Sequence, residues 1–218
     1  MPVSNHIVLT AAEARVLGAL LEKAVTTPEY YPLSLNALIN ACNQRSNREP
    51  MMNLDEDDVR QALHGLENKG LAGRARSADG RVTKYEHWLG EAFNFSRAEE
   101  ALVCVLLLRG PQTAGELRGR TERMHRFDEL ANVLAGLQKL TEREPPLAAL
   151  LPRLPGTKEP RYAHLLSGPA ESSALAAVEH AAGSAARDGR MAQLEADVAA
   201  LRQEVAALRQ KMDSLGRD

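Results

Sequence analysis

Several residue types on which whole classes of protein depend are scarce in this sequence. Aromatic residues make up only 4% of the 218-residue chain, so we expect a core of aliphatic side chains. The two cysteines, Cys42 and Cys104, fall on apolar helix faces far apart in the chain, which predicts buried thiols in a reducing cytoplasm rather than a disulfide. No apolar run approaches the ~20 residues of a membrane span, and no signal-peptide pattern is present. We therefore expect a cytoplasmic protein without a membrane partner.

The motifs of catalysis and of cofactor or metal binding are also missing. The sequence has no glycine-rich phosphate loop, no Cys-x-x-Cys pair and no His-Glu-x-x-His motif. Its six histidines are scattered singly, without the spacing of metal ligands. The acidic run from Asp55 to Asp58 begins a predicted helix, where carboxylates complement the helix dipole, and this favours a structural role over paired-acid catalysis. We expect no enzymatic activity, no cofactor and no metal site.

An excess of basic charge is lacking as well. The formal net charge is -2, and residues 1–165 carry equal numbers of basic and acidic side chains. Nucleic-acid affinity rests largely on neutralised phosphates. A chain without a global basic footprint must therefore gather its cations on one face to bind DNA.

What the sequence does contain is an internal repeat. Residues 10–88 and 96–165 both read as three amphipathic helices followed by a hairpin. Each copy opens with a capping box, Thr10-x-x-Glu13 in the first and Ser96-x-x-Glu99 in the second. The apolar stripes of the two first helices match at an offset of 86 residues: Val16, Leu17, Leu20 and Leu21 correspond to Leu102, Val103, Leu106 and Leu107.

The third helices of the two copies align at a smaller offset. Val59, Leu63, Gly65 and Leu66 match Leu130, Leu134, Gly136 and Leu137 at an offset of 71, which predicts that they occupy equivalent places. The first copy then has 15 more residues than the second between its first and third helices. Most of that excess is a polar segment, residues 43–54, and long polar loops on compact scaffolds often carry function.

The end of the chain has a different composition. Residues 167–189 are rich in Ala, Ser and Gly and read as a linker. An unbroken heptad follows at 190–218, with Met191, Val198, Val205 and Met212 at position a and Leu194, Leu201, Leu208 and Leu215 at position d. Valine at a with leucine at d favours two strands, and the flanking charges favour a parallel pair, so we expect a homodimer through this helix. The alternative is a helix that folds back onto its own chain.

Together these patterns predict a mainly α fold with small β-hairpins, in the α+β class. We expect two tandem winged-helix domains, residues 1–90 and 91–166, followed by the linker at 167–189 and a coiled-coil tail at 190–218. A winged helix contains a helix-turn-helix, and the architecture binds DNA in many proteins and other proteins in some.

Candidate residues for nucleic-acid or partner binding fall in three clusters. The polar loop offers Asn43, Gln44, Arg45, Asn47 and Arg48. The hairpin of the first copy, or wing, offers Arg74, Arg76, Arg81 and Lys84, and the second copy offers Arg118, Arg120, Arg123 and Arg126. The loop and the wing each have a structural alternative, because the loop can hydrogen-bond itself into place and the wing cations can form a solvated face.

Several unusual strings resemble the bacterial YceH family. They are Thr26-Thr-Pro-Glu29, Ala41-Cys-Asn-Gln44, Asn47-Arg-Glu-Pro50, Arg81-Val-Thr-Lys-Tyr85 and Leu106-Leu-Leu-Arg-Gly-Pro-Gln-Thr113. The resemblance covers about residues 8–166 and continues more loosely into the tail. It implies a tandem winged-helix fold in a family without an established biochemical role, and it supplies no catalytic residues.

Two functions from different classes fit these patterns. The first is a dimeric DNA-binding protein of transcription-regulator type, with basic wings on the phosphates of double-stranded DNA. The second is a protein-interaction module similar to the tandem winged-helix subunits of bacterial chromosome-segregation complexes. The acidic starts of the third helices, at Asp55 to Asp58 and at Asp128 and Glu129, favour the second function, whereas the wing cations favour the first.

Overall fold

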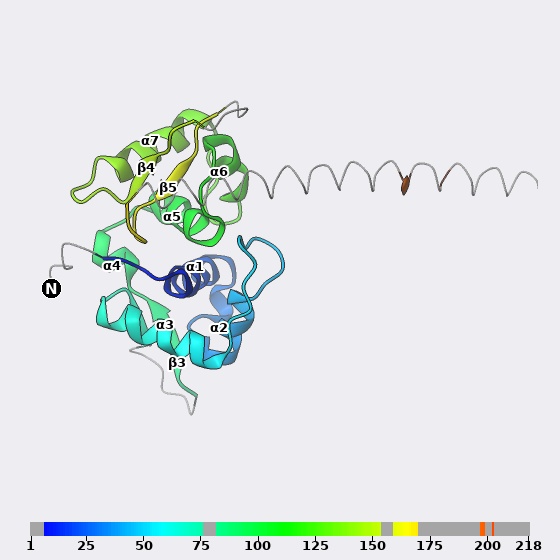
Figure 1. The fold of residues 1–218 in the computed structure, drawn as a ribbon, viewed down its shortest axis with the longest axis vertical. Helices are drawn as coiled ribbons and strands as arrows, with labels where there is room; N and C mark the ends of the chain where they lie inside the picture. The colour runs from blue at the N-terminus through cyan, green and yellow to red at the C-terminus, as the bar shows by residue number, and fades with distance from the viewer. Residues whose placement is uncertain (1–6, 76–81, 154–158, 170–196, 199–201, 203–218) are drawn as a thin grey trace, which may run out of the picture. The chain divides into compact units, whose positions relative to one another are not determined.

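The computed structural model describes residues 7–75, 82–153 and 159–169, together with residues 197–198 and 202 of the tail (Figure 1). The first half contains α1 (Ala11–Thr26), the 3-10 helix η1 (Pro28–Tyr30), β1 (Leu33–Ser34), α2 (Leu35–Cys42), α3 (Glu56–Asn68), β2 (Ala72–Arg74) and β3 (Lys84–His87). After a connecting helix, α4 (Leu89–Phe93), the second half contains α5 (Arg97–Arg109), α6 (Ala114–Arg120), α7 (Leu130–Thr141), β4 (Ala148–Leu150) and β5 (Tyr162–His164). The described residues form an α+β fold, which confirms the predicted class.

Side-chain caps fix where the main helices begin. Reciprocal capping boxes start α1 and α5, as the sequence predicts, and another starts α6. At α3, Asp55 accepts from the backbone N–H of Asp58 while the Asp58 carboxylate accepts from the backbone N–H of Asp55. Part of the acidic run is therefore a helix cap.

Each half ends in an antiparallel hairpin. The first half has a three-stranded sheet in the order β1-β3-β2, in which Leu33 pairs with Tyr85 and Arg74 with Tyr85 from the other side. In the second half β4 pairs with β5, and an isolated bridge joins Gln112 to Tyr162. The hairpin tips, residues 76–81 and 154–158, lie outside the described residues.

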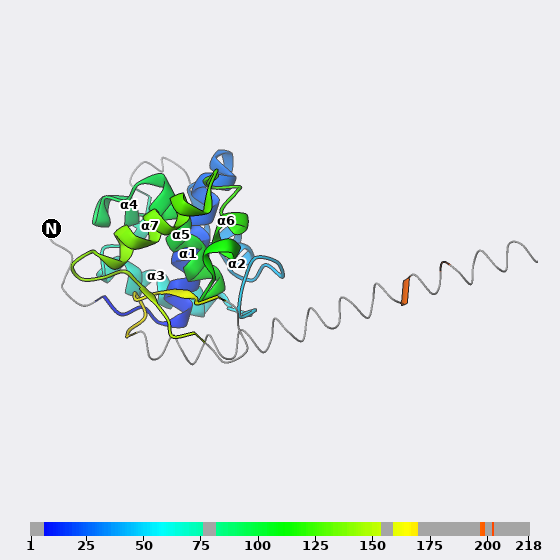
Figure 2. The same ribbon diagram turned by 90° about the horizontal axis from the view of Figure 1, so that it is seen from above.

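The two halves pack through their first helices, α1 and α5, which lie in the middle of the folded body (Figure 1; Figure 2). A single hydrophobic cluster includes Leu17 and Leu20 of α1 as well as Leu102 and Leu106 of α5. The helices approach closely at Gly18, where an added Cβ would lie 2.8 Å from Cγ of Leu108. The core is therefore continuous from one half to the other.

The third helices correspond in a different register from the one that the sequence predicts. The buried residues are Val59, Ala62, Leu63 and Leu66 in α3 and Val133, Gly136, Leu137 and Leu140 in α7, which match at an offset of 74. The predicted offset of 71 is therefore wrong by three residues, or about one helical turn. Leu130 and Leu134 are 42% and 41% exposed rather than buried. The prediction failed because α7 carries apolar residues beyond its buried face, so a second apolar stripe competes with the true one.

The heptad of the tail lies mostly outside the described residues. Of its eight apolar positions only Val198 is described, in a short helical stretch with a side chain that is 46% exposed; Met191, Leu194, Leu201, Val205, Leu208, Met212 and Leu215 are not. Dimerisation through the tail stays a prediction. Within the described parts of the chain, no helix is both long and apolar enough to cross a bilayer.

Candidate functional site

The exposed face of α3 is acidic. Glu56, Asp57 and Asp58 are all exposed in its first turn, and Glu67 is exposed near its end. Arg60 is used locally, because its Nη2 lies 2.7 Å from Oε1 of Glu56. The surface that α3 presents to a ligand is therefore negative and repels phosphate groups.

The exposed face of α7 is apolar. Leu130 and Leu134 project from it, and Leu150 of β4 is 52% exposed. Leu134 and Leu150 line an open groove of about 540 Å³, named here the α7 groove, whose other lining residues are Gln138, Thr141, Pro146, Ala148, Ala149, Tyr162 and Leu165. None of these described residues is charged at neutral pH. Contiguous exposed apolar surface of this kind typically marks an interaction site.

Two of the four predicted wing cations lie in the described part of the hairpin. Arg74 ends β2 and Lys84 begins β3, and both side chains are exposed. The strands bring them close, because the backbone N–H of Ala75 donates to the carbonyl of Lys84. Arg76 and Arg81 fall outside the described residues. The wing thus presents at least two solvent-facing cations, one on the edge strand β2 and one on the central strand β3.

The polar loop, residues 43–54, is held in place by hydrogen bonds. Asn43 spans it, with its amide donating to the Leu54 carbonyl and accepting from the Leu54 N–H, each at 2.8 Å. Arg48 is buried: it donates to the Ala41 carbonyl at 3.0 Å and to Oε2 of Glu22 at 2.5 Å. Asn43 and Arg48 therefore stabilise the fold. Of the other candidates in the loop, Arg45 is exposed and Gln44 is half-buried.

The loop also contacts the second half of the protein. The backbone N–H of Glu49 donates to the Leu108 carbonyl at 2.8 Å, and Arg109 donates to Oδ1 of Asn47. Figure 1 shows the segment rising from the end of α2 toward α5 and α6. The 12-residue polar segment is therefore a strap between the halves, in addition to any role in binding.

Arg15 of α1 anchors this strap, a role that sequence reasoning missed. It is fully buried in α1 and donates to the carbonyl of Cys42, which directly precedes the strap, at 3.1 Å and to that of Pro50, within the strap, at 2.5 Å. Burial first, and then the nearby charge of Arg48, lower its pKa from 12.5 to about 10. The available signal was a cation placed inside the apolar run of α1.

The arginine cluster of the second half is only partly free. Arg118 donates to the backbone carbonyls of Phe127 and Asp128, so it closes the turn after α6. Arg126 lies 3.8 Å from Asp128 on the surface. Arg120 and the exposed Arg123 face a cavity toward the strap.

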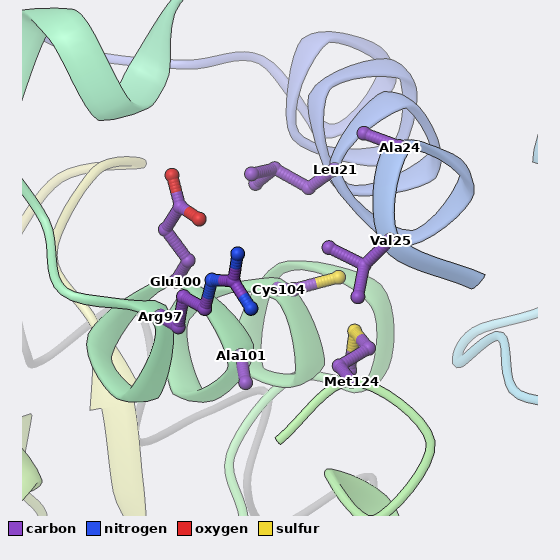
Figure 3. A pocket seen from close by; sticks show the side chains of 8 residues that line it. All are labelled: Leu21, Ala24, Val25, Arg97, Glu100, Ala101, Cys104 and Met124. Atoms are coloured by element: carbon purple, nitrogen blue, oxygen red, sulfur yellow. The ribbon is translucent and has the colours of Figure 1, made fainter. Parts of the chain in front are cut away.

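A separate pocket of about 270 Å³ lies between the end of α1 and the start of α5 (Figure 3). Leu21, Val25 and Met124 make its apolar wall, and Arg97 and Glu100 supply its polar side. Cys104 at the base donates to the Gly18 carbonyl, and burial raises the pKa of its thiol. A buried thiol with a raised pKa is a poor nucleophile. The pocket therefore has the walls of a binding site rather than the activated group of a catalytic one.

These features define a helical protein of two similar halves whose exposed surfaces differ in chemistry. Within the described residues, no group of three or more His, Cys, Asp or Glu side chains is placed to hold a metal ion.

Comparison with known proteins identifies the family. Residues 9–157 match the family described as "Protein of unknown function, DUF480". The chain is 59% identical over 194 residues to a UPF0502 protein of Koribacter versatilis, covering 88% of this chain and 89% of the relative. It is 55% identical to a UPF0502 protein of Citrifermentans bemidjiense, covering 88% of each chain, and 52% identical to one of Azoarcus, covering 87% of this chain and 84% of the relative. The chain therefore belongs to the DUF480, or UPF0502, family of bacterial proteins, in agreement with the YceH resemblance.

Proposed function

We propose that this chain is a non-enzymatic tandem winged-helix protein that binds a protein partner through the α7 groove. The element order supports two winged helices. The first half runs α1-β1-α2-α3-β2-β3 with sheet order β1-β3-β2, and the second runs α5-α6-α7-β4-β5, with the Gln112–Tyr162 bridge in the place of the first strand.

The chemistry of the third helices carries the proposal. In a helix-turn-helix protein that reads DNA, this helix enters the major groove and its first residues approach the bases. Here α3 begins with exposed Glu56, Asp57 and Asp58, and α7 exposes Leu130 and Leu134. A duplex would meet negative charge on one helix and uncharged leucines on the other. Neither surface neutralises phosphate, whereas the α7 face suits another apolar surface.

The expected occupant of the α7 groove is an apolar segment of a different protein. Its lining is uncharged, so a basic or acidic peptide would lose hydration without gaining an ion pair. Leu134 and Leu150 are the central contacts, because exposed leucines at the edge of a groove gain the most from burial, roughly 25 cal/mol per Å². A second copy of this chain, or its own tail, would be the competing occupant.

A titration with duplex DNA tests whether the partner is a protein rather than DNA. Fluorescence anisotropy of a labelled random duplex would be followed with the full-length protein at low salt and across a salt series. We expect no saturable binding that depends on Arg74 and Lys84. Binding that falls with salt at a log–log slope of roughly −0.9 per phosphate, and that Arg74→Glu with Lys84→Glu flattens, would overturn the proposal.

DNA binding through the wing is the second candidate function. Arg74 and Lys84 are the observation that favours it, since both are exposed cations of the described part of the hairpin. In that case the wing cations would bind the phosphates of the duplex, and α3 would not contact the DNA. A homodimer formed through the tail would then place two such wings on one duplex.

A further inference from the structure

A cavity of about 290 Å³ lies where the two halves meet beside the strap. The end of α1, the strap, α5 and the turn after α6 each contribute to its wall, and Gly119 leaves it open on the α6 side. Its size is that of a site for a small molecule. Three arginines lie in its wall, whereas the pocket beside Cys104 has one and the α7 groove has none.

Three arginines line the cavity, and their positive charges are poorly matched. Arg109 is half-buried and donates to a neutral acceptor, Oδ1 of Asn47. Arg123 is exposed at the rim. Arg120 is held only loosely by Glu116, with 3.5 Å between Nη2 and Oε1, and its buried Nη1 has no hydrogen-bond partner among the described residues.

Three of the carboxylates near the cavity are occupied or peripheral, and a fourth, Glu49, acts on Arg109. Glu116 is claimed by Arg161, whose Nη1 lies 2.7 Å from Oε2. Glu22 lines the cavity but already receives Arg48 at 2.5 Å and lies 3.6 Å from Lys23. Glu122 also lines the cavity, and it is exposed at the surface.

The electrostatic result is visible at Arg109. Burial first, and then the charge of Arg120, lower the pKa of its guanidinium; Glu49 and Glu22 oppose this shift, and Arg48 adds only a smaller lowering effect. Arg120 and Arg109 therefore repel each other across the cavity wall, and an anion between them would relieve that repulsion.

We propose that this cavity binds the phosphate or carboxylate group of a small anionic metabolite, with Arg120, Arg123 and Arg109 as its donors. Guanidinium groups bind such oxyanions through paired, charge-assisted hydrogen bonds. An anion here would satisfy Nη1 of Arg120 and would bridge α5, α6 and, through Arg109 and Asn47, the strap. The site shares no lining residue with the α7 groove. A bound anion would contact residues of both halves and would therefore tighten the junction between them.

Isothermal titration calorimetry of the full-length protein tests the site. Inorganic phosphate and citrate are titrated separately, with sodium chloride at matched ionic strength as the blank. We expect saturable binding of at least one of the two, and the one that binds identifies phosphate or carboxylate as the recognised group. Binding of neither probe would overturn the proposal.

Three variants locate the binding. Gly119→Leu adds an uncharged side chain to the cavity wall and should abolish binding; the fold should tolerate it, because an added Cβ at Gly119 meets no atom within 4 Å. Arg123→Gln should weaken binding by about 10-fold, the effect of losing one charged donor. Arg126→Gln removes the same charge from the neighbouring surface and should leave the affinity unchanged. Binding that survives Gly119→Leu, or that falls equally with Arg126→Gln, would contradict the assignment, and thermal unfolding confirms that each variant is folded.

Discussion

Cys104 of α5 donates a hydrogen bond to the backbone carbonyl of Gly18 on α1, with 3.4 Å between sulfur and oxygen. The two residues are separated by 86 positions, which is the offset at which the first helices of the repeat correspond. Equivalent positions of the two halves therefore touch each other. This is the geometry of a self-complementary contact between two copies, realised inside one chain.

The close approach at Gly18 predicts that a methyl group there destabilises the protein. In Gly18→Ala the added Cβ would lie 2.8 Å from Cγ of Leu108 and 3.2 Å from Cβ of Leu107, so the helices must move apart. Overpacking costs about 1–3 kcal/mol, which exceeds the ~1 kcal/mol that alanine contributes to a helix over glycine. Urea unfolding followed by circular dichroism should show a net loss of about 1 kcal/mol.

Gly119→Ala is the matched control for that measurement. It makes the same substitution in α6, where nothing lies within 4 Å of the added Cβ. The helix propensity then acts alone, and the free energy of unfolding should rise by up to about 1 kcal/mol. A gain in stability for both variants would contradict the packing described for α1 and α5.

The ion pair between Glu22 and Arg48 predicts a pH-dependent contribution to stability. Burial by itself raises the pKa of the Glu22 carboxyl, but the hydrogen bond and charge of Arg48, with Lys23, outweigh it and lower the pKa below 4.5. Glu22→Gln leaves Arg48 buried without its counter-ion, which costs about 3 kcal/mol at pH 7. Equilibrium unfolding in urea measures this difference.

The sign of the pH effect follows from the lowered pKa. Glu22 stabilises the fold fully above the unfolded pKa of 4.5, and this contribution is lost as the pH falls through the lower folded pKa. The gap between the wild type and Glu22→Gln should therefore narrow below pH 4.5. Glu56→Gln is the control, because its ion pair with Arg60 is exposed to solvent and should contribute little to stability at any pH. Equal costs for the two variants would rule out the buried pair.

The thiols are predicted to be unreactive in the folded protein. Burial raises the pKa of Cys42 from 9.0 to about 12, against the smaller opposing effects of Arg15 and Arg48, and burial raises that of Cys104 as well. The thiolate fraction of Cys42 at pH 8 is then roughly 1,000-fold smaller than in the unfolded chain. Ellman's reagent should label both thiols promptly in guanidinium and neither on the same time scale without it. Rapid labelling of one equivalent in the native protein would contradict the burial.

The heptad at 190–218 predicts a homodimer in solution. Sedimentation equilibrium should give twice the chain mass for the full-length protein and the single-chain mass for a chain that ends at Gly168. Because only about three to four heptads are available, the dimer should be weak and should dissociate on dilution. A monomer at all concentrations would favour the helix that folds back.

Local chemistry made the helices predictable. The capping boxes at Thr10 and Ser96 and the apolar stripes behind them are patterns of neighbouring residues, and the structure contains both helices with these starts. The same locality explains the error at α7, where Leu130 and Leu134 continue an apolar stripe that only the packing against the core can reject. Leu130 and Leu134, which were predicted to be buried, instead form part of the exposed apolar face of α7.

The partners of the polar loop could not be predicted, because they come from elsewhere in the chain. Arg48 meets Glu22 across 26 residues and Arg109 meets Asn47 across 62. A segment rich in Asn and Arg has the same sequence pattern whether its side chains bind a ligand or form hydrogen bonds between the two halves of the protein. Only the fold distinguishes Arg48, which is buried, from Arg45, which faces solvent.

Co-purification with the tagged full-length protein tests the central claim, that a protein partner occupies the α7 groove. Protein and nucleic acid would both be quantified for the wild type, for Leu134→Lys with Leu150→Lys, and for Val8→Lys, which adds a lysine at another exposed apolar position. We expect a partner protein that the wild type and Val8→Lys retain, that the groove variant loses, and that binds again when purified, with nucleic acid at background in all three. Recovery of nucleic acid that depends on Arg74 and Lys84, with the same proteins retained by the groove variant, would contradict the account.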